Sequence, residues 1–304
     1  MKIAIMATGG LGGYYGALLA KDGHAVTFIA RGAHLQAIRA NGLTIKSLHG
    51  DLAVKPAHAT DNPSQVGVVD WIIFGVKTYD TAHAAQAMKP MIGAQTTVVT
   101  FQNGVDSHEQ IAALIGKEHV IVAPTQIVSN ITAPGLIEQK SPFRSSFVGE
   151  VYGQGLTPRV EEFAAMLKRT GVDAAAVGDG RTPLWHKFVF IASIAGLASL
   201  ARTEPHILFQ LPEARATLRA AMEEVYVVGK AQGVALDADI VGRLTTPRPS
   251  VTAGRNVFTW TRPLTGTPNG DAPSLLNASY TFKVEIEVPQ GGAEGMLITS
   301  GGRF

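Results

Sequence analysis

The sequence contains no cysteine among its 304 residues. Disulfide bonds, thiol nucleophiles and thiolate metal sites are therefore excluded. The nine histidines show no spacing typical of metal ligands, so we expect no metal cofactor. A chain without cysteine is compatible with a reducing compartment, and we expect a cytoplasmic protein.

A large charge of one sign is also lacking, since 26 lysines and arginines against 24 acids leave a formal charge of +2. This balance provides no basic field for nucleic acid, and we expect no nucleic-acid partner. The longest apolar run, Phe188–Ala201, is shorter than the roughly 20 residues that span a bilayer, which predicts a buried core helix and no membrane partner. The chain begins directly with a strand-like run, so we expect no signal peptide.

The N-terminal stretch predicts a dinucleotide-binding unit of strand, glycine turn, helix and strand. Lys2–Met6 is a short apolar run that a glycine cluster ends, and a second strand follows at Ala25–Ala30. A helix N-terminus offers unpaired N–H groups and partial positive charge to a pyrophosphate. The segment in register with the usual G-x-G-x-x-G pattern consists of Ala7, Thr8, Gly9, Gly10, Leu11 and Gly12.

This segment departs from the pattern at its first position, where Ala7 replaces glycine. We expect the tight turn to form with the small methyl group, at some loss of cofactor affinity. Gly9 would let the backbone approach the pyrophosphate, and Gly12 would let the helix pack on the strand. The alternative is a glycine-rich packing turn that binds no nucleotide.

The end of the second strand predicts which nicotinamide cofactor binds. NAD sites place an acid near this point for the ribose 2′-hydroxyl, whereas an arginine suits a 2′-phosphate. No acid lies between Gly23 and Asp51, and Arg31 directly follows the strand. Arg31 therefore predicts NADP(H), the alternative being a solvated loop arginine.

Strands then alternate with helices, which predicts a parallel, doubly wound sheet. The buried strands expected at Asp70–Val76 and Thr97–Phe101 are followed by Lys77 and by Asn103. Ligands of such sheets bind beyond the carboxyl ends of the strands, so both side chains are expected near the glycine turn. For Asn103 the alternative is a plain turn residue, because Asn-Gly is common in turns.

Three regions are expected along the chain. Residues 1–180 form a Rossmann-type NADP-binding domain, with short strands over 126–148 that suggest an antiparallel edge. From Arg181 the pattern changes to long helices, expected at Thr182–Leu200, Pro212–Gln232 and Asp237–Leu244, which predicts an incomplete all-α substrate or dimerisation domain over 181–248. Residues 249–304 read as a β-rich tail with a period-2 strand at Tyr280–Val288.

With these motifs in order, residues 1 to about 245 resemble the ketopantoate reductase (2-dehydropantoate 2-reductase) family. The resemblance rests on the glycine turn, Arg31, Lys77, the Asn103-Gly104 pair and the helix opening Leu184-Trp-His-Lys-Phe188. It implies NADPH-dependent reduction of 2-dehydropantoate, a 2-oxo acid, to pantoate in the pathway to pantothenate, by an oxidoreductase of the class acting on CH–OH groups.

The resemblance also implies roles for individual residues. Lys187 matches the family's catalytic lysine, which binds the ketone oxygen and supplies its proton, and an ammonium there would stabilise the developing alkoxide. Asn103 matches an asparagine that contacts cofactor and substrate, and Lys77 a lysine near the nicotinamide. For Lys187 the alternative is a snorkelling helix lysine.

The chain departs from the family in two places. Ile191 and Ala195 stand where well-studied members carry asparagines, which predicts a more apolar substrate pocket. The family's later helix, with a serine and a glutamate for the site, is not found after Pro249. Instead, residues 250–304 resemble a C-terminal fragment of an arylsulfatase, without that enzyme's C/S-x-P-x-R motif or metal-binding acids.

Three other functions stay open beside the leading one. The chain could reduce another, more apolar 2-oxo acid, or be an NADP-binding remnant with an incomplete active site. An interaction module built on the tail has little support beyond the tail's presence. The sequence does not decide the oligomeric state, for which a homodimer is one option.

Overall fold

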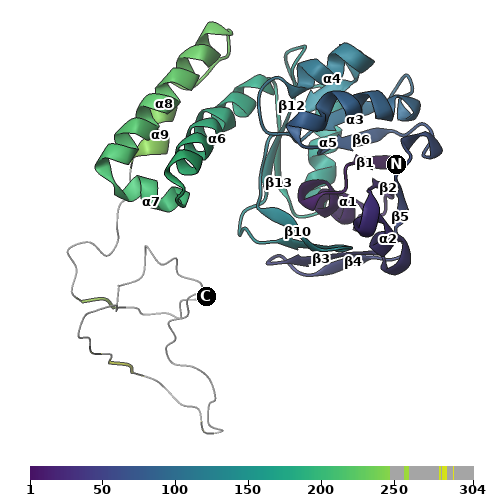
Figure 1. The fold of residues 1–304 in the computed structure, drawn as a ribbon, viewed down its shortest axis with the longest axis horizontal. Helices are drawn as coiled ribbons and strands as arrows, with labels where there is room; N and C mark the ends of the chain where they lie inside the picture. The colour runs from purple at the N-terminus through teal and green to yellow at the C-terminus, as the bar shows by residue number, and fades with distance from the viewer. Residues whose placement is uncertain (247–256, 260–280, 282, 286–289, 291–304) are drawn as a thin grey trace. The chain divides into compact units, whose positions relative to one another are not determined.

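The computed structural model describes residues 1–246, 257–259, 281, 283–285 and 290, and divides the chain into the units Met1–Thr246 and Pro247–Phe304 (Figure 1). The β-rich tail expected over 249–304 lies mostly outside the described residues. Of the strand expected at Tyr280–Val288, the described residues 281 and 283–285 belong to no helix or strand. The expected division of the first unit at residue 180 stays a prediction.

A large, mostly parallel sheet forms the centre of the first unit. Its strands, in spatial order, are β13 (Asp173–Val177), β12 (Ser145–Glu150), β8 (Val120–Val122), β7 (Thr97–Thr100), β6 (Trp71–Phe74), β1 (Lys2–Met6), β2 (Ala25–Ile29) and β5 (His58–Thr60). Strand β12 runs antiparallel to β8 and to the short β9 (Thr125–Gln126), and the other neighbours are parallel. The predicted α/β class with a doubly wound parallel sheet is confirmed.

Helices cover both faces of this sheet because alternate strand residues point to opposite sides. Ile3 and Ile5 of β1 belong to one core, and Ala4 and Met6 to another. The first core includes α1 (Gly10–Lys21) and α5 (Pro158–Arg169), and the second includes α3 (Thr81–Met88) and α4 (Ser107–Ile115). Both faces are therefore buried, which explains why the strands are apolar without alternation.

A second, smaller sheet packs against α1. Its order is β10 (Ser129–Ala133), β11 (Leu136–Gln139), β3 (Leu43–Ser47) and β4 (Leu52–Val54), and α2 (Gly32–Asn41) connects β2 to β3. The antiparallel edge expected over 126–148 is thus only partly right. Strand β12 joins the large sheet antiparallel, whereas β11 pairs in parallel with β3, Leu136 opposite Thr44.

The chain continues into a helical layer of α6 (Arg181–Ala201), α7 (Pro205–Gln210), α8 (Pro212–Ala231) and α9 (Ile240–Thr245), visible in green in Figure 1. Val189, Leu218 and Met222 are fully buried in its core. Single turns of 3₁₀ helix lie at Pro63–Gln65, Thr78–Asp80, Lys89–Met91 and Lys117–His119.

Helix α6 differs from the expected buried core helix. The apolar run lies inside a 21-residue helix whose second half is largely exposed, with Leu200 at 83%. Among the described residues, α6 is the helix that meets the length and apolarity of a membrane span, and 28% of its apolar stretch is buried. In this fold α6 packs on α7, α8 and α9.

The junction between sheet and helices is tightly bonded. The Asp179 carboxylate accepts hydrogen bonds from the backbone N–H of Arg181 (2.9 Å) and the hydroxyl of Thr182 (2.8 Å). Gly180 lies against Gly149 of β12, where a side-chain carbon on Gly149 would come within 2.6 Å of the Gly180 backbone. These contacts fix the start of α6 relative to the sheet, and hence the position of Lys187.

Candidate active site

The glycine turn has the geometry of an anion-binding helix N-terminus. The first backbone bond of α1 runs from Gly13 N–H to the Gly9 carbonyl (2.8 Å), so the amides of Gly10, Leu11 and Gly12 lack helical partners. The space where a Gly9 side chain would stand is open for 4 Å, whereas a side-chain carbon on Gly12 would lie 2.4 Å from the Ala7 carbonyl oxygen. These distances support backbone approach at Gly9 and helix packing at Gly12.

Ala7 makes the turn in the left-handed region, with φ of +70°. This conformation costs an alanine roughly 1–2 kcal/mol, a cost that glycine does not carry. The methyl group is therefore tolerated, and the departure from the usual pattern appears as local backbone strain.

Two polar groups near the turn are buried without a hydrogen-bond partner among the described residues. One is the hydroxyl of Thr8, which is 4% exposed, and the other is Nε2 of His34 on α2. Gly135 donates its N–H to the other ring nitrogen (3.0 Å), so Nε2 carries the proton. Burial lowers the pKa of His34, and a polar interaction of its ring with the Thr8 backbone opposes this in part, so His34 is not an independent sign of a ligand. The unpartnered hydroxyl of Thr8 beside free amides fits a bound phosphate-containing cofactor.

Arg31 lies at the same edge of the sheet. The Thr8 N–H donates to the Ile29 carbonyl (2.8 Å), which ties the turn to the end of β2, directly before Arg31. The Arg31 side chain is exposed and forms no ion pair or hydrogen bond with the described residues. It is free to meet a ligand at the turn.

Lys77 and Asn103 follow β6 and β7, and both are exposed. Gln102, to which the sequence assigned no role, precedes Asn103 and is buried, with 6% of its surface exposed. Its amide donates to the Val76 carbonyl (3.1 Å) and the Thr81 hydroxyl (2.8 Å), joining the loops that carry Lys77 and Asn103. The sequence did contain a signal for this bridging role, because Gln102 is a polar residue that closely follows the buried strand β7.

Lys187 reaches from α6 to β9, the short strand that begins three residues after the end of β8. Its ammonium donates a hydrogen bond to the carbonyl of Thr125 (2.7 Å). Burial lowers the pKa of Lys187 from the usual 10.5 to about 8, because desolvation disfavours the charged form. The group is therefore still protonated at neutral pH and close to the range suited to proton transfer.

Thr125 connects Lys187 to the cofactor helix, a link that the sequence did not reveal. The hydroxyl of Thr125 donates to the Ser145 carbonyl (2.8 Å) and shares a short hydrogen bond with the hydroxyl of Tyr15 on α1. Since the Thr125 hydrogen is committed to Ser145, Tyr15 is the donor. Tyr15 is fully buried, and burial raises the pKa of its hydroxyl, which keeps the proton in place.

Strand order brings the sequence-predicted residues into one row. The order β7, β6, β1, β2 places Asn103, Lys77, the glycine turn and Arg31 beyond successive strand ends. The Lys187 contact, Thr125, extends the row on the other side of β7, because it follows the last residue of β8 by three residues. Four strand spacings correspond to roughly 19 Å, the scale of an extended dinucleotide. The structure shows no direct contact among Lys77, Asn103 and Lys187, so a ligand would bridge them.

The stripe of α6 that continues from Lys187 is apolar. Lys187, Ile191 and Ala195 lie on one stripe of α6 at i, i+4 and i+8 spacing, with Ile191 half-buried and Ala195 exposed. Trp185 instead packs towards α8, where a side-chain carbon on Gly229 would lie 2.8 Å from its ring.

Comparison with known proteins identifies the family and the fold. Residues 3–151 match the family model for ketopantoate reductase PanE/ApbA, and residues 179–253 match the model for its C-terminal domain. A 2-dehydropantoate 2-reductase from Mesorhizobium japonicum is 30% identical over 255 residues, covering 77% of each chain.

Solved structures give the same result. The 2-dehydropantoate 2-reductase from Geobacter metallireducens superposes with a TM-score of 0.75 at 30% identity, over 81% of each chain. A D-mandelate dehydrogenase, solved with NADH and anilino(oxo)acetate, superposes with a TM-score of 0.74 over 81% of this chain and 79% of its own. At 20% identity this second likeness shows the shared fold alone.

Proposed function

The chain belongs to the ketopantoate reductase PanE/ApbA family, a family of oxidoreductases acting on CH–OH groups with a nicotinamide cofactor, and we propose that it reduces 2-dehydropantoate to pantoate with NADPH. The observation that carries the proposal is the half-buried ammonium of Lys187, held beyond the carboxyl end of β8 at the same edge of the sheet as the glycine turn.

The bound nicotinamide would supply the hydride, which leaves the chain the work of stabilising the oxygen. Lys187 donates a hydrogen bond to the ketone oxygen and transfers its proton as negative charge develops there. Its partial burial strengthens this interaction because few waters compete. Asn103 and Lys77 orient the 2-oxo acid and the nicotinamide beside it.

The other half of the proposal is the phosphorylated cofactor. The free amides of Gly10, Leu11 and Gly12 bind the pyrophosphate, and Thr8 adds its unpaired hydroxyl. Arg31 binds the 2′-phosphate, since it is exposed and no acid takes its place.

Replacing Lys187 by alanine tests the catalytic role. We expect kcat for ketopantoate reduction to fall by about 10²–10⁴-fold, the range for a lost general acid, with NADPH affinity within about threefold because the lysine is at the substrate end. Wild-type kcat should decline above the Lys187 pKa of about 8, where the ammonium loses its proton. Stopped-flow NADPH oxidation across pH measures both effects.

The exposed Lys230 of α8 offers a matched control, since Lys230→Ala removes a lysine outside the site. Retained activity in Lys187→Ala would remove this residue from its role. NADPH binding by the wild-type chain without turnover of any 2-oxo acid would instead identify a cofactor-binding remnant.

Replacing Arg31 by alanine tests the cofactor assignment. Loss of charge-assisted bonds to the 2′-phosphate should weaken NADPH binding about 10–100-fold while NADH binding changes little. Fluorescence titration with each cofactor measures the ratio, and Arg39→Ala on α2 is the control for loss of a nearby surface arginine. Equal weakening of both cofactors would exclude a 2′-phosphate contact.

A second candidate substrate is favoured by the stripe that Lys187 shares with Ile191 and Ala195. These apolar side chains suit a 2-oxo acid with a larger hydrocarbon group than ketopantoate. A panel of 2-oxo acids ranked by kcat/KM decides between the two. A higher value for a branched or aromatic 2-oxo acid than for ketopantoate would replace the leading substrate.

A further inference from the structure

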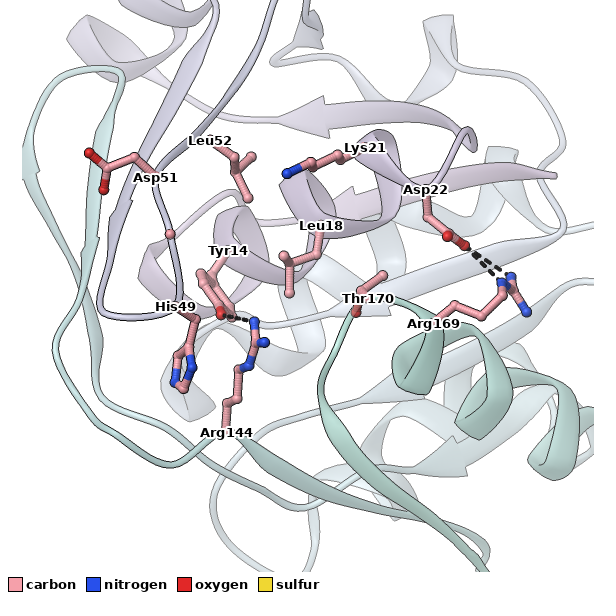
Figure 2. A pocket seen from close by; sticks show the side chains of 11 residues that line it. Tyr14, Leu18, Lys21, Asp22, His49, Asp51, Leu52, Arg144, Arg169 and Thr170 are labelled. Atoms are coloured by element: carbon pink, nitrogen blue, oxygen red, sulfur yellow. Dashed lines mark hydrogen bonds and ion pairs between the residues drawn. The ribbon is translucent and has the colours of Figure 1, made fainter.

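A cavity of about 320 Å³ lies along one side of α1, away from the candidate active site (Figure 2). Its lining includes Tyr14, Leu18 and Lys21 of α1, His49 of the β3–β4 turn, Arg144 before β12 and Arg169 at the end of α5. No lining residue belongs to the glycine turn or is Arg31, Lys77, Asn103 or Lys187. The cavity is therefore separate from the site proposed for NADPH and the 2-oxo acid.

The acids of this cavity are already neutralised. Asp22 forms an ion pair with Arg169 (3.0 Å), and Asp51 forms one with Lys46 outside the lining (2.5 Å). Figure 2 shows the Asp51 carboxylate pointing away from the other side chains. Lys21 and Arg144 have no carboxylate partner among the described residues, so the cavity keeps an excess of positive charge.

Arg144 is held in a fixed position. Its guanidinium is half-buried and donates a single hydrogen bond, to the hydroxyl of Tyr14 (3.0 Å), whose side chain is 1% exposed. Gly171, at φ of +81°, leaves room beside it, because a side-chain carbon there would lie 2.6 Å from Nη2. Within the described part of the chain, the remaining N–H donors of this guanidinium have no acceptor.

A half-buried cation without a counter-charge has lost part of its hydration, and the oxygens of a bound anion replace it. The planar fork of arginine matches the oxygens of phosphate and carboxylate, and a lysine adds a mobile second charge. Because Tyr14 already orders the guanidinium, binding would carry little further entropy cost.

We propose that this cavity binds the anionic head group of a small metabolite, a phosphate or a carboxylate, with Arg144 as the principal contact and Lys21 as the second cation. The cavity volume exceeds that of a bare ion and accommodates part of the attached molecule. The proposal does not depend on the reaction proposed above.

Isothermal titration calorimetry with inorganic phosphate and with malonate tests the proposal. Saturating NADP⁺ is present in each titration so that added anion does not occupy the glycine turn. We expect a saturable site whose affinity is weakened at least about tenfold in Arg144→Gln and several-fold in Lys21→Gln. Lys117→Gln, which removes an exposed charge from the turn before β8, should bind as the wild-type chain does.

Binding of phosphate alone or of malonate alone supports the site and identifies the head group. Gly171→Ala should weaken either ligand, because the new methyl group displaces the guanidinium. Absence of saturable binding of both anions overturns the proposal, as does equal affinity in the wild-type chain, Arg144→Gln and Lys21→Gln. If Arg144→Gln does not fold, the exposed Lys21 still decides the outcome.

Discussion

At the scale of single residues, the hydroxyl of Tyr15 connects helix α1 to Lys187 through Thr125. It donates to the Thr125 hydroxyl, while the carbonyl of Thr125 accepts the Lys187 ammonium. Tyr15 also stacks on Phe101 at 4.8 Å, and both are buried, so its ring has little freedom to move. Tyr15 therefore acts as a positioning residue that holds the acceptor of Lys187 in place.

Removing this hydroxyl in Tyr15→Phe should lower kcat about 3–10-fold and leave the KM for NADPH within about twofold. The unfolding free energy should fall by about 1 kcal/mol, the value of one hydrogen bond. A looser carbonyl stabilises the ammonium less, so the pKa seen in the kcat–pH profile should drop below that of the wild type. Rate profiles and urea denaturation measure these quantities.

Tyr14→Phe is the matched control, since it removes a buried hydroxyl from the same helix without touching Thr125. Both variants should lose similar stability, but only Tyr15→Phe should shift the kcat profile. A purely structural role for Tyr15 would show as lost stability with unchanged kcat and an unchanged profile.

At the scale of single residues, the sequence predicts a residue's place at the end of a strand but not its contact with a residue far away in the chain. Arg31, Lys77, Asn103 and the glycine turn each follow a recognisable strand, so their place at the carboxyl edge could be predicted. Tyr15 and Thr125 lie 110 residues apart in the sequence. Nothing local to either residue indicates the other, and their contact depends on the packing of α1 against β9.

At the scale of elements, a buried ion pair joins β12 to α5. Arg159 donates to the Glu150 carboxylate through Nε (2.7 Å) and Nη2 (2.6 Å), and the Thr157 hydroxyl donates to it as well (2.7 Å). Burial raises the pKa of Glu150, but the hydrogen bonds from Arg159 and Thr157 outweigh it and lower the pKa below its usual value. The ionised form therefore stabilises the fold.

Glu150→Gln should reduce the unfolding free energy by about 3 kcal/mol at pH 7, because Arg159 is left partly buried without a counter-charge. A depressed folded-state pKa gives stability that is present above the unfolded pKa and lost as pH falls through the folded value. The difference between wild type and variant should accordingly shrink below about pH 4. Urea denaturation at several pH values measures it.

Glu223→Gln in α8 is the control for this pair, since Glu223 bonds Arg219 at 2.8 Å with both side chains about half exposed. An exposed i, i+4 pair contributes only about 0.3–0.5 kcal/mol. Equal losses in the two variants, or a Glu150→Gln difference that persists at low pH, would contradict the assigned role.

The bounds of helices and strands were predictable where a periodic pattern extended over many residues. They were less predictable for short elements that form because they pair with a neighbour. The bounds of α6 and α8 agree with the expected bounds to within one residue at each end. Strand β5 has three residues and depends on its parallel pairing with β2, and α7 has six residues. Neither is long enough to show a period, so both were missed, and α9 is shorter than expected.

At the scale of the whole molecule, the hydrophobic cores that the structure describes consist of residues before residue 247. The two cores of the large sheet use residues up to Ala176, and the helical core ends with Leu244. The row of candidate residues from Arg31 to Lys187 also lies within Met1–Thr246, the first compact unit. Folding and cofactor binding are therefore properties expected of this unit alone.

A chain ending at Thr246 should melt within about 3 °C of the full chain and oxidise NADPH with ketopantoate at a kcat within about twofold, since its apolar cores are unchanged. Differential scanning calorimetry and NADPH oxidation on both chains measure this.

A chain ending at Leu211 is the contrast, because it removes Leu218 and Met222, two fully buried residues that pack against α6. It should lose the cooperative transition of the helical layer through several kcal/mol of lost burial. If the chain ending at Thr246 melts cooperatively but has no activity, residues 247–304 supply part of the active site, and the row of strand ends is incomplete without them.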